Sequence, residues 1–486
     1  MTAHKTSASK YAALAAGVLA FVATKLLPAP PGLPETGFQI LGVLVSAIVL
    51  FLSWGTGWTS MAVVFALMTV PGVSVSQVTQ ATFGNSTVVF LLFCFMLASS
   101  LTESGAARRI AIWFLTNSLA RKSPWWTVAM YFTAVYVLNL FLSAATCIMI
   151  LMPILLSIFE NVGLDKGRRC QLSSMLLLCT VVVSQLANGS NPISHAVTTQ
   201  GFSLYESYTG EPMDFFLFCA IGTPISVVSV LVVYLLVRLV WKPDVSSFSG
   251  IDYDMLAASC GKVSKREKWS VAFYCACVVL WLLPGLSRYI LPSVYPILSK
   301  ISNCIPPLIA LFLMNFITVD GEKILDWGDA VKAVNWPTFL FIASIMGLGS
   351  FMGEPEAGIS EWLSQILSPV FSGVHPTVFL ILMVLIVNVL TNFCSNSVAL
   401  SAVYTVALPL CMSVYEGMLE PMLLSILITS AAQNGWATAP ATPAAAVAYA
   451  SGWGDSKTIL KWGMLILLIQ MAIGLTLGSL LGSLLL

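Results

Sequence analysis

Thr391-Asn392-Phe393-Cys394-Ser395-Asn396-Ser397 interrupts an apolar run that extends from about Val378 to Met412. Polar side chains inside a run long enough to cross a bilayer are costly unless polar partners meet them. Backbone unwinds at that depth only where it is buried in protein or lines a cavity. The stretch therefore predicts a turn between two half-helices that presents hydroxyls, an amide and free carbonyls to a small ion or solute. The alternative is a polar kink packed against a neighbouring helix.

The composition of the whole chain is that of a membrane protein. Of its 486 residues, 58% are hydrophobic and only 9% are charged, whereas a soluble globular chain carries about a quarter charged residues. The net charge of +1 is too small to indicate binding to nucleic acid. The 11 cysteines and three histidines show no metal-ligand spacing. Since no catalytic motif appears either, the sequence predicts an integral α-helical protein of the lipid bilayer that is not an enzyme.

The distribution of lysine and arginine predicts the orientation of the chain. Lys5 and Lys10 precede an apolar segment from Tyr11 to Leu27, and no signal-peptide cleavage site follows, so this segment is expected to be a retained first transmembrane helix. A cytoplasmic N-terminus places most basic residues on the inside, and Arg288 and Lys300 are the exceptions. We therefore expect a multi-pass protein of the inner (plasma) membrane.

A second copy of the polar interruption lies in the first half of the chain. The apolar run 125–159 holds Asn139-Leu140-Phe141-Leu142-Ser143-Ala144-Ala145-Thr146 in its middle. It is too long for one upright helix and too short for two full spans, which indicates a re-entrant hairpin with its tip at 139–146. Two broken helices follow the tips, with breaks at 188–192 and 439–443.

The tips and the breaks repeat at one spacing. Ser143 and Ser395 are 252 residues apart, and so are Gly189 and Ala441. The orientation places the two hairpins on opposite faces of the membrane, so the two halves are predicted to be inverted repeats. Matching interrupted segments in inverted halves point to a transporter site near the bilayer midplane. Half-helix N-termini favour an anion there, and unwound carbonyls favour a hard cation such as Na⁺.

The predicted fold is an all-α integral membrane protein with about 11 transmembrane helices, two re-entrant hairpins and inverted repeats. The predicted parts are N-terminal scaffold helices 1–80, the first repeat 81–241, a cytoplasmic linker 242–268, scaffold helices 269–326 of the second half, and the second repeat 327–486.

The second half resembles the divalent-anion/sodium symporter family, the di- and tricarboxylate and sulfate carriers. That family pairs a Ser-Asn-Thr tip with a Thr-Pro break in each half, and this chain has Ser395-Asn396-Ser397 and Ala441-Thr442-Pro443. The similarity covers roughly residues 80 to 486. The resemblance implies an elevator-type transporter that is a homodimer.

The resemblance also implies binding residues. It implies sodium in the second half near Thr391, Cys394, Asn396 and Ala441, with Cys394 and Ala441 acting through their carbonyls. It implies substrate contacts in the second half from Asn396, Ser397, Thr442 and Pro443. In the first half Ser143, Ser190 and Asn191 are the candidates for substrate contacts.

The first half departs from the family pattern at its tip. Ala144 and Ala145 stand where the family has Asn and Thr, although Asn139, Ser143 and Gly189 keep oxygens for a first sodium site. The bridging amide and the hydroxyl are lost, which leaves this site and the usual dicarboxylate pose open. Asn191 and His195 are candidates to compensate, and a histidine bonded to a nearby carbonyl is the alternative for His195.

Three classes of function follow from these observations. The first is a Na⁺-coupled secondary carrier of a small anion, and its variant is a sodium-independent anion exchanger. The second is a channel, which would need a continuous polar path, and the third is an enzyme, for which no motif exists.

Four amides precede the breaks and either line the cavity or tie helices together: Gln185, Asn188, Gln433 and Asn434. Arg108 and Arg109 are expected to be surface anchors.

Overall fold

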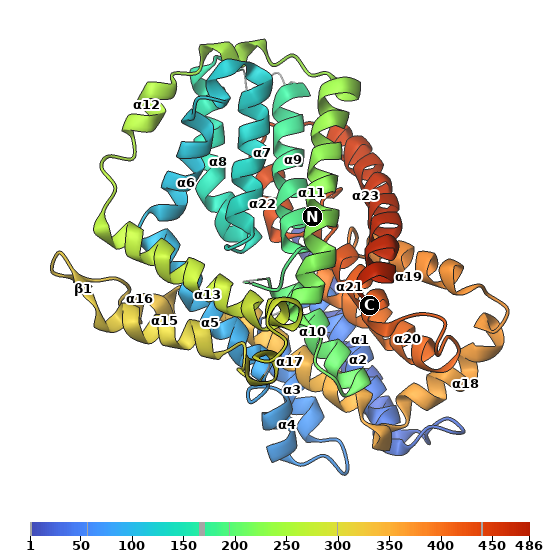
Figure 1. Cartoon of the computed structure of the whole chain (residues 1–486). Helices are drawn as coiled ribbons and strands as arrows, with labels where there is room; N and C mark the ends of the chain where they lie inside the picture. The colour runs from blue at the N-terminus through green and yellow to red at the C-terminus, as the bar shows by residue number, and fades with distance from the viewer. Residues whose placement is uncertain (1, 56, 165–170, 194, 299, 439–440) are drawn as a thin grey trace.

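The computed structural model describes residues 2–55, 57–164, 171–193, 195–298, 300–438 and 441–486, and this part of the chain is almost entirely helical (Figure 1). The one strand pair in the described part is a short antiparallel hairpin of β1, Thr318–Val319, and β2, Glu322–Lys323. An all-α architecture was predicted from the sequence, and the described structure confirms it.

The first half of the chain forms eleven described α-helices. They are α1 (Thr2–Leu26), α2 (Glu35–Trp54), α3 (Trp58–Met68), α4 (Val75–Ala81), α5 (Ser86–Glu103), α6 (Ala106–Thr116), α7 (Pro124–Asn139), α8 (Ala144–Asn161), α9 (Gln171–Asn188), α10 (Ala196–Thr209) and α11 (Phe215–Leu236). A 3₁₀ turn, Ala120–Lys122, precedes α7, and a π-helical turn, Val237–Trp241, extends α11.

The second half begins with 3₁₀ turn Ser246–Gly250 and continues with twelve described α-helices. They are α12 (Tyr253–Ala258), α13 (Lys265–Ile290), α14 (Tyr295–Leu298), α15 (Ile305–Phe316), α16 (Trp327–Lys332), α17 (Trp336–Gly353), α18 (Ile359–Phe371), α19 (Pro376–Leu390), α20 (Asn396–Ser413), α21 (Pro421–Ala432), α22 (Pro443–Ala450) and α23 (Ser456–Leu485). A 3₁₀ turn, Pro355–Ala357, lies between α17 and α18.

Eight helices in the described part are long and apolar enough to cross a membrane, and the bent pair α18–α19 would make nine. The sequence predicts about 11 spans because it counts α3 and α15 as full crossings. These two helices contain only 11 and 12 residues, and a helix of that length reaches about 17 Å at 1.5 Å per residue, roughly half the hydrocarbon thickness. The number 11 and the re-entrant course of the hairpins stay predictions.

The helices on either side of the two tips begin and end at matching positions. α7 begins at Pro124 and α19 at Pro376, while α8 begins at Ala144 and α20 at Asn396, so both pairs are separated by the predicted 252 residues. Proline suits the first turn of a helix because its missing N–H has no partner there in any case. The chain thus uses the same start signal in both halves.

The cytoplasmic linker predicted at 242–268 gives way to helix earlier than expected. α13 begins at Lys265, because the side chain of Ser264 accepts a hydrogen bond from the Glu267 N–H and caps the helix. The linker itself contains only the short helix α12 and a 3₁₀ turn. Its last residues contact α6 through Arg109, which donates to the carbonyls of Cys260, Gly261 and Lys262.

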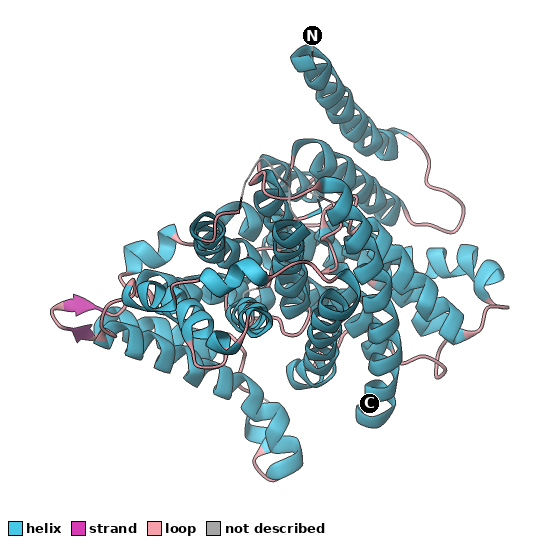
Figure 2. Ribbon diagram, turned by 90° about the horizontal axis from the view of Figure 1, so that it is seen from above, coloured by secondary structure: helices cyan, strands magenta, loops and turns pink. Residues whose placement is uncertain are grey.

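The buried apolar side chains form two clusters. The larger one joins α2, α3, α5 to α9, α13, α15, α17, α22 and α23, and the smaller one joins α10, α11 and α19 to α21. Helix α10 contributes Leu204 and Tyr205 to the smaller cluster and also packs against α17, so it connects the two clusters. Figure 2 shows that α1, at the end marked N, runs along the periphery of the molecule.

Candidate functional site

A cavity of about 900 Å³ brings the two predicted tips and the two predicted breaks together. Residues 143–146 of the first tip and 393–397 of the second tip line it. Residues 195–197 and 441–444, which begin the second halves of the broken helices, line it as well, and α5 and α17 add part of the wall. Segments about 250 residues apart in the sequence therefore meet at one place.

The predicted site residues divide into those that line this cavity and those that lie behind it. The residues in the lining are Ser143, Cys394, Asn396, Ser397, Ala441, Thr442 and Pro443. The predicted residues outside the described lining are Asn139, Gly189, Ser190, Asn191 and Thr391. Residues 439–440 of the second break lie outside the described part of the chain.

Thr391 lies directly behind Asn396, in a group of oxygen atoms. Its Oγ1 is 2.5 Å from Oδ1 of Asn396 and 2.6 Å from the carbonyl oxygen of Ala432. A hydroxyl carries one proton and cannot donate to two acceptors at once. Only one of the two acceptors can receive a full hydrogen bond at a time, and Thr391 thus belongs to an oxygen-rich group beside Asn396.

Gly435 leaves room for an ion beside these oxygens. A Cβ placed on Gly435 would lie 2.6 Å from Oδ1 of Asn396 and 3.0 Å from the carbonyl oxygen of Thr391. The Gly435 carbonyl accepts a hydrogen bond from Thr442 Oγ1 at 3.3 Å. Oxygens from the tip and from the break thus converge on a space that only glycine leaves open. The third atom near that point is the methyl carbon Cγ2 of Thr442, at 3.1 Å. Oxygens such as the other two are the ligands that a hard cation such as Na⁺ prefers.

Asn392 fastens the second tip to the second break. Its Oδ1 accepts hydrogen bonds from the N–H groups of Trp436 (3.2 Å) and Ala437 (2.9 Å), and its Nδ2 donates to the carbonyls of Asn388 and Asn434, each at 2.9 Å. All four hydrogen-bonding positions of the amide are used, so unwound backbone is satisfied by a side chain. The sequence contains this residue in its polar tip but gives no sign of the partners 44 and 45 residues away.

The polar atoms of the first tip are engaged with one another. Ser143 Oγ lies 2.9 Å from Thr146 Oγ1 and also accepts from the Thr146 N–H at 3.3 Å. Asn139 accepts from Ser184 Oγ at 2.9 Å and donates to the Val135 carbonyl at 2.8 Å. These oxygens therefore already have partners within the protein.

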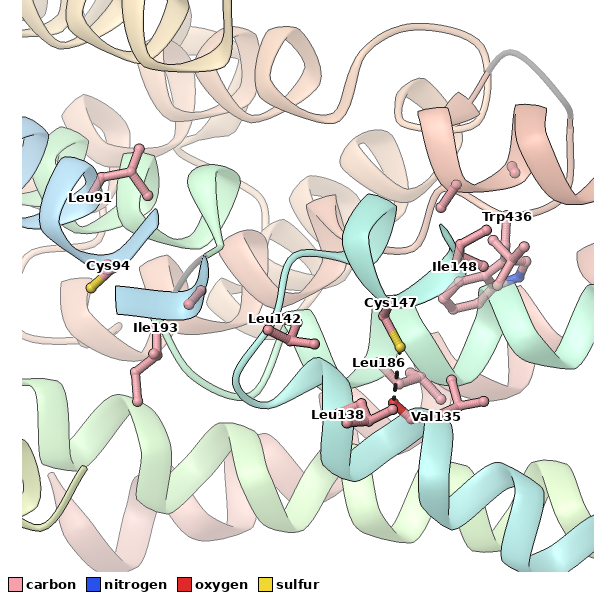
Figure 3. Packing of buried hydrophobic residues seen from close by; sticks show 14 of the residues in the cluster. Leu91, Cys94, Val135, Leu138, Leu142, Cys147, Ile148, Leu186, Ile193 and Trp436 are labelled. Atoms are coloured by element: carbon pink, nitrogen blue, oxygen red, sulfur yellow. Dashed lines mark hydrogen bonds between the residues drawn. The ribbon is translucent and has the colours of Figure 1, made fainter. Parts of the chain in front are cut away.

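The first tip stands on a tightly packed apolar base. Figure 3 shows Leu138, Leu142 and Leu186 around Cys147, whose thiol points at the Val135 carbonyl with Sγ 4.0 Å from the oxygen. Leu142 and Cys147 are fully buried. Because the base is close-packed, the tip residues that line the cavity are held on a rigid support.

The first break uses its own polar side chains to hold its turn. Asn191 Oδ1 accepts from the Ile193 N–H at 2.8 Å, and Ser190 Oγ donates to the Ala187 carbonyl at 2.6 Å. The Gly189 carbonyl accepts from Ser430 Oγ of α21 at 3.0 Å. These three residues shape the break, and their predicted contacts with substrate or sodium stay predictions.

The two broken helices are bonded to each other beside the cavity. Gln433 Nε2 donates to Thr198 Oγ1, and Thr198 Oγ1 donates to the Asn188 carbonyl, both at 2.8 Å. Asn188 Nδ2 donates to Gln185 Oε1 at 2.9 Å. Gln185, Asn188, His195 and Gln433 all line the cavity, so the amides before the breaks both line it and tie helices together. Asn434 instead bonds Asn388 behind the second tip, at 2.8 Å.

Four helices begin at the wall of the cavity. The first residues of α8, α10, α20 and α22 are Ala144, Ala196, Asn396 and Pro443, and all four belong to the lining. A helix N-terminus carries about half a positive charge and directs N–H groups outward. The described lining holds no lysine, arginine, aspartate or glutamate. Two helices also end there, because α9 ends at Asn188 and Gln433 is the C-cap residue of α21. The electrostatics of the cavity therefore come from backbone dipoles, and its four helix N-termini favour an anion.

The fold is one that membrane transporters use. It is similar to the crystal structure of the YdaH transporter of Alcanivorax borkumensis, with a TM-score of 0.53 and 11% sequence identity, and the match covers 93% of this chain and 99% of that one. Such a distant likeness concerns the fold alone. With the apolar helices described above, it indicates the fold of a multi-pass membrane protein.

The sequence places the chain within one family of such proteins. The family model for the sodium:sulfate symporter transmembrane region matches residues 8–486, and the chain belongs to this family. The resemblance found in the sequence is thereby confirmed. This is a family of transporters, and membership of it supports a function as a secondary transporter of anions.

Curated relatives match at low identity. A protein named sodium-dependent dicarboxylate transporter SdcS from Staphylococcus saprophyticus is 24% identical over 371 residues, which cover 72% of this chain and 68% of that one. Its namesake from Staphylococcus aureus is 23% identical over 388 residues, with 74% and 70% coverage. A protein named only as a membrane protein, from Cupriavidus necator, is 21% identical over 374 residues, with 72% and 68% coverage.

Proposed function

We propose that this protein is a secondary active transporter that couples Na⁺ to the movement of a small anion across the cytoplasmic membrane. The anion belongs to the carboxylates, other organic anions or sulfate. The observation that carries the proposal is the convergence of four helix N-termini on a cavity without formally charged side chains. Such a site attracts an anion through partial charges alone and can release it again, as a carrier must.

Sodium is assigned to the second half of the chain. Thr391 and Asn396 would hold the ion with the carbonyl of Gly435, while Cys394 and Ala441 supply further carbonyls from the same wall. The bound cation would offset the charge of an anion held by Asn396, Ser397 and Thr442. Binding of one would then favour binding of the other, which is what coupling requires.

The proposal includes alternating access of the elevator type, which the family resemblance implies. The two tips and the two breaks would move as one body against the remaining helices, which would serve as the scaffold and as the contact between two copies of the chain in a homodimer. The hydrogen bonds from Gln433 to Thr198 and from Ser430 to Gly189 support movement of the breaks as a unit.

Uptake by proteoliposomes tests the proposal. We expect an inward Na⁺ gradient to drive accumulation of a labelled anion into empty vesicles, and replacement of Na⁺ by K⁺ to abolish it. A series of carboxylates and sulfate would be used as probes. Saturable, Na⁺-driven uptake supports the carrier, whereas unsaturable flux that follows the anion gradient alone would indicate a channel.

A sodium-independent anion exchanger is the second candidate. It is favoured by the first tip, where Ala144 and Ala145 offer no oxygen to a cation and the oxygens of Asn139 and Ser143 bond within the protein. An exchanger would take up labelled anion only into vesicles preloaded with unlabelled anion, and it would ignore Na⁺. The same vesicles therefore distinguish the two candidates.

A further inference from the structure

The two tips present different chemistry to the same cavity, although they occupy matching positions in the two halves. Asn396 and Ser397 follow Ser395, whereas Ala144 and Ala145 follow Ser143. We propose that the transported anion carries a single charged group and an uncharged remainder, with the charged group at the second tip and the remainder against the first. This inference rests on the proposed function and names the substrate class of that site.

The second tip keeps hydrogen-bond donors for the charged group. Asn396 is 6% exposed and Ser397 4% exposed, and both line the cavity at the start of α20. Oδ1 of Asn396 faces Thr391 Oγ1, and its Nδ2 makes no hydrogen bond with a described residue. No side chain caps α20 through its N-cap residue, Ser395. The first turn of α20 therefore offers backbone and side-chain N–H groups to an anion.

A cross-connection holds this first turn in place. Gln200 of α10 donates from Nε2 to the Ser397 carbonyl at 3.1 Å and to Ser401 Oγ at 2.7 Å. Gln200 is fully buried, so water does not compete for these hydrogen bonds. The donors of the second tip are thereby preorganised by a residue of the first half.

The first tip offers methyl groups where the second tip offers donors. Ala144 and Ala145 line the cavity, and one turn further along α8 Met149 and Ile150 line it too. The hydroxyls of Ser143 and Thr146 bond each other, which leaves one hydroxyl proton for the pair. The side of the cavity built by α8 is thus largely apolar.

A second carboxylate would be poorly placed against this surface. It would lose water at two alanines whose side chains cannot donate hydrogen bonds, so that only backbone N–H groups at the start of α8 would face it, and no lysine or arginine belongs to the described lining. Burial of an unpaired carboxylate is far less favourable than burial of an amide, and burial of an apolar group is favourable. Anions with one charge should be preferred over dianions of the same length.

Matched compounds test the preference directly. Thermal stability of the purified full chain in Na⁺ would be measured with succinate, with its monoamide and with butyrate, which share four carbons, and with sulfate and methanesulfonate. We expect the single-charge compounds to stabilise the protein at concentrations at least tenfold lower than the dianions, and to compete for uptake in the same order. A tighter response to succinate or sulfate would overturn the inference.

A double variant tests the assignment to the first tip. Ala144→Asn with Ala145→Thr restores the donors found in the second tip, so we expect succinate affinity to rise at least tenfold while the affinity for butyrate does not increase. The matched control is Ala257→Asn with Ala258→Thr, which alters the same dipeptide on the exposed face of α12. An equal response in both double variants, or no response in the first, would overturn the assignment.

The outcomes separate this inference from the proposed function. If succinate is transported with Na⁺ better than its monoamide, the carrier stands and the single-charge inference fails. If none of the five anions stabilises the protein or accumulates in vesicles, both fail together. Preference for the monoamide and butyrate, lost in the tip variant alone, supports both.

Discussion

Asn396 and Gly435 lie so close that a Cβ on Gly435 would be 2.6 Å from Oδ1 of Asn396. The two residues come from different elements, the second tip and the second break. Their approach creates the small oxygen-lined space in which the proposed sodium ion would be bound. The absence of a side chain at Gly435 is therefore as important for this site as the oxygens themselves.

Replacement of Gly435 by alanine should remove the response to sodium. The added methyl group would fill the space beside Asn396 and Thr391, so we expect Na⁺ to raise the apparent melting temperature of wild type and not of Gly435→Ala. Choline would replace Na⁺ at constant ionic strength. Gly474→Ala is the matched control, because Gly474 of α23 has nothing within 4 Å of the added Cβ. If Na⁺ stabilised both variants equally, the proposed sodium site beside Gly435 would be wrong.

Replacement of Asn396 by alanine should abolish anion uptake while the protein still inserts and elutes as a single folded species. Asn396 is assigned to both sodium and anion, so uptake should fall at least 100-fold, which corresponds to about 2.7 kcal/mol of lost interaction. Asn161→Ala on the exposed end of α8 serves as the control. Normal uptake by Asn396→Ala would mean that the cavity binds its anion elsewhere.

The positions of the tips were predictable because their signals are local. A serine before a helix start, a proline at the first turn and a polar gap in an apolar run all act within a few residues. These signals repeat at 252 residues, and the helices α7, α8, α19 and α20 begin where they indicate. Residues of both tips and residues beside both breaks line one cavity, and binding of sodium or an anion there stays a prediction.

Other features of the structure depend on contacts between distant segments, and the sequence alone does not predict them. The four hydrogen bonds of Asn392 involve Asn388, Asn434, Trp436 and Ala437, and only the fold brings the last three within reach. The short helices α3 and α15 look like full spans to a hydropathy pattern, because their apolar flanks continue the signal after the helix has ended. The hydropathy pattern of a sequence does not show where such a helix ends.

Replacement of Asn392 by alanine should destabilise the second break. Two buried N–H groups and two carbonyls would lose their partner, and we expect the free energy of unfolding to fall by about 3 kcal/mol. Chemical denaturation of the detergent-solubilised protein measures this loss. Asn315→Ala is the control, since Asn315 bonds only exposed partners near β2. A loss of less than about 1 kcal/mol would show that the break holds its shape without this side chain.

Arg109 should stabilise the linker far more than Arg121 does, although each forms an ion pair with a shortest distance of 2.7 Å. The side chains of Arg109 and Glu267 are 22% and 11% exposed, whereas those of Arg121 and Asp254 are 41% and 84% exposed. Arg109 also donates to three linker carbonyls, and its hydrogen bond with Glu267 raises the pKa of the guanidinium. The sequence suggests that Arg109 is a surface anchor, whereas the structure shows a partly buried side chain that binds Glu267 and three carbonyls.

We therefore expect Arg109→Ala to lower the free energy of unfolding by about 2 kcal/mol, and Arg121→Ala by less than about 1 kcal/mol. Arg109→Lys should not restore stability, because an ammonium group cannot reproduce the planar fork of donors that reaches both Glu267 and the carbonyls. Limited proteolysis within residues 242–264 should accelerate in both Arg109 variants and stay at the wild-type rate in Arg121→Ala. Equal proteolysis of the two alanine variants would show that the linker is held by other contacts.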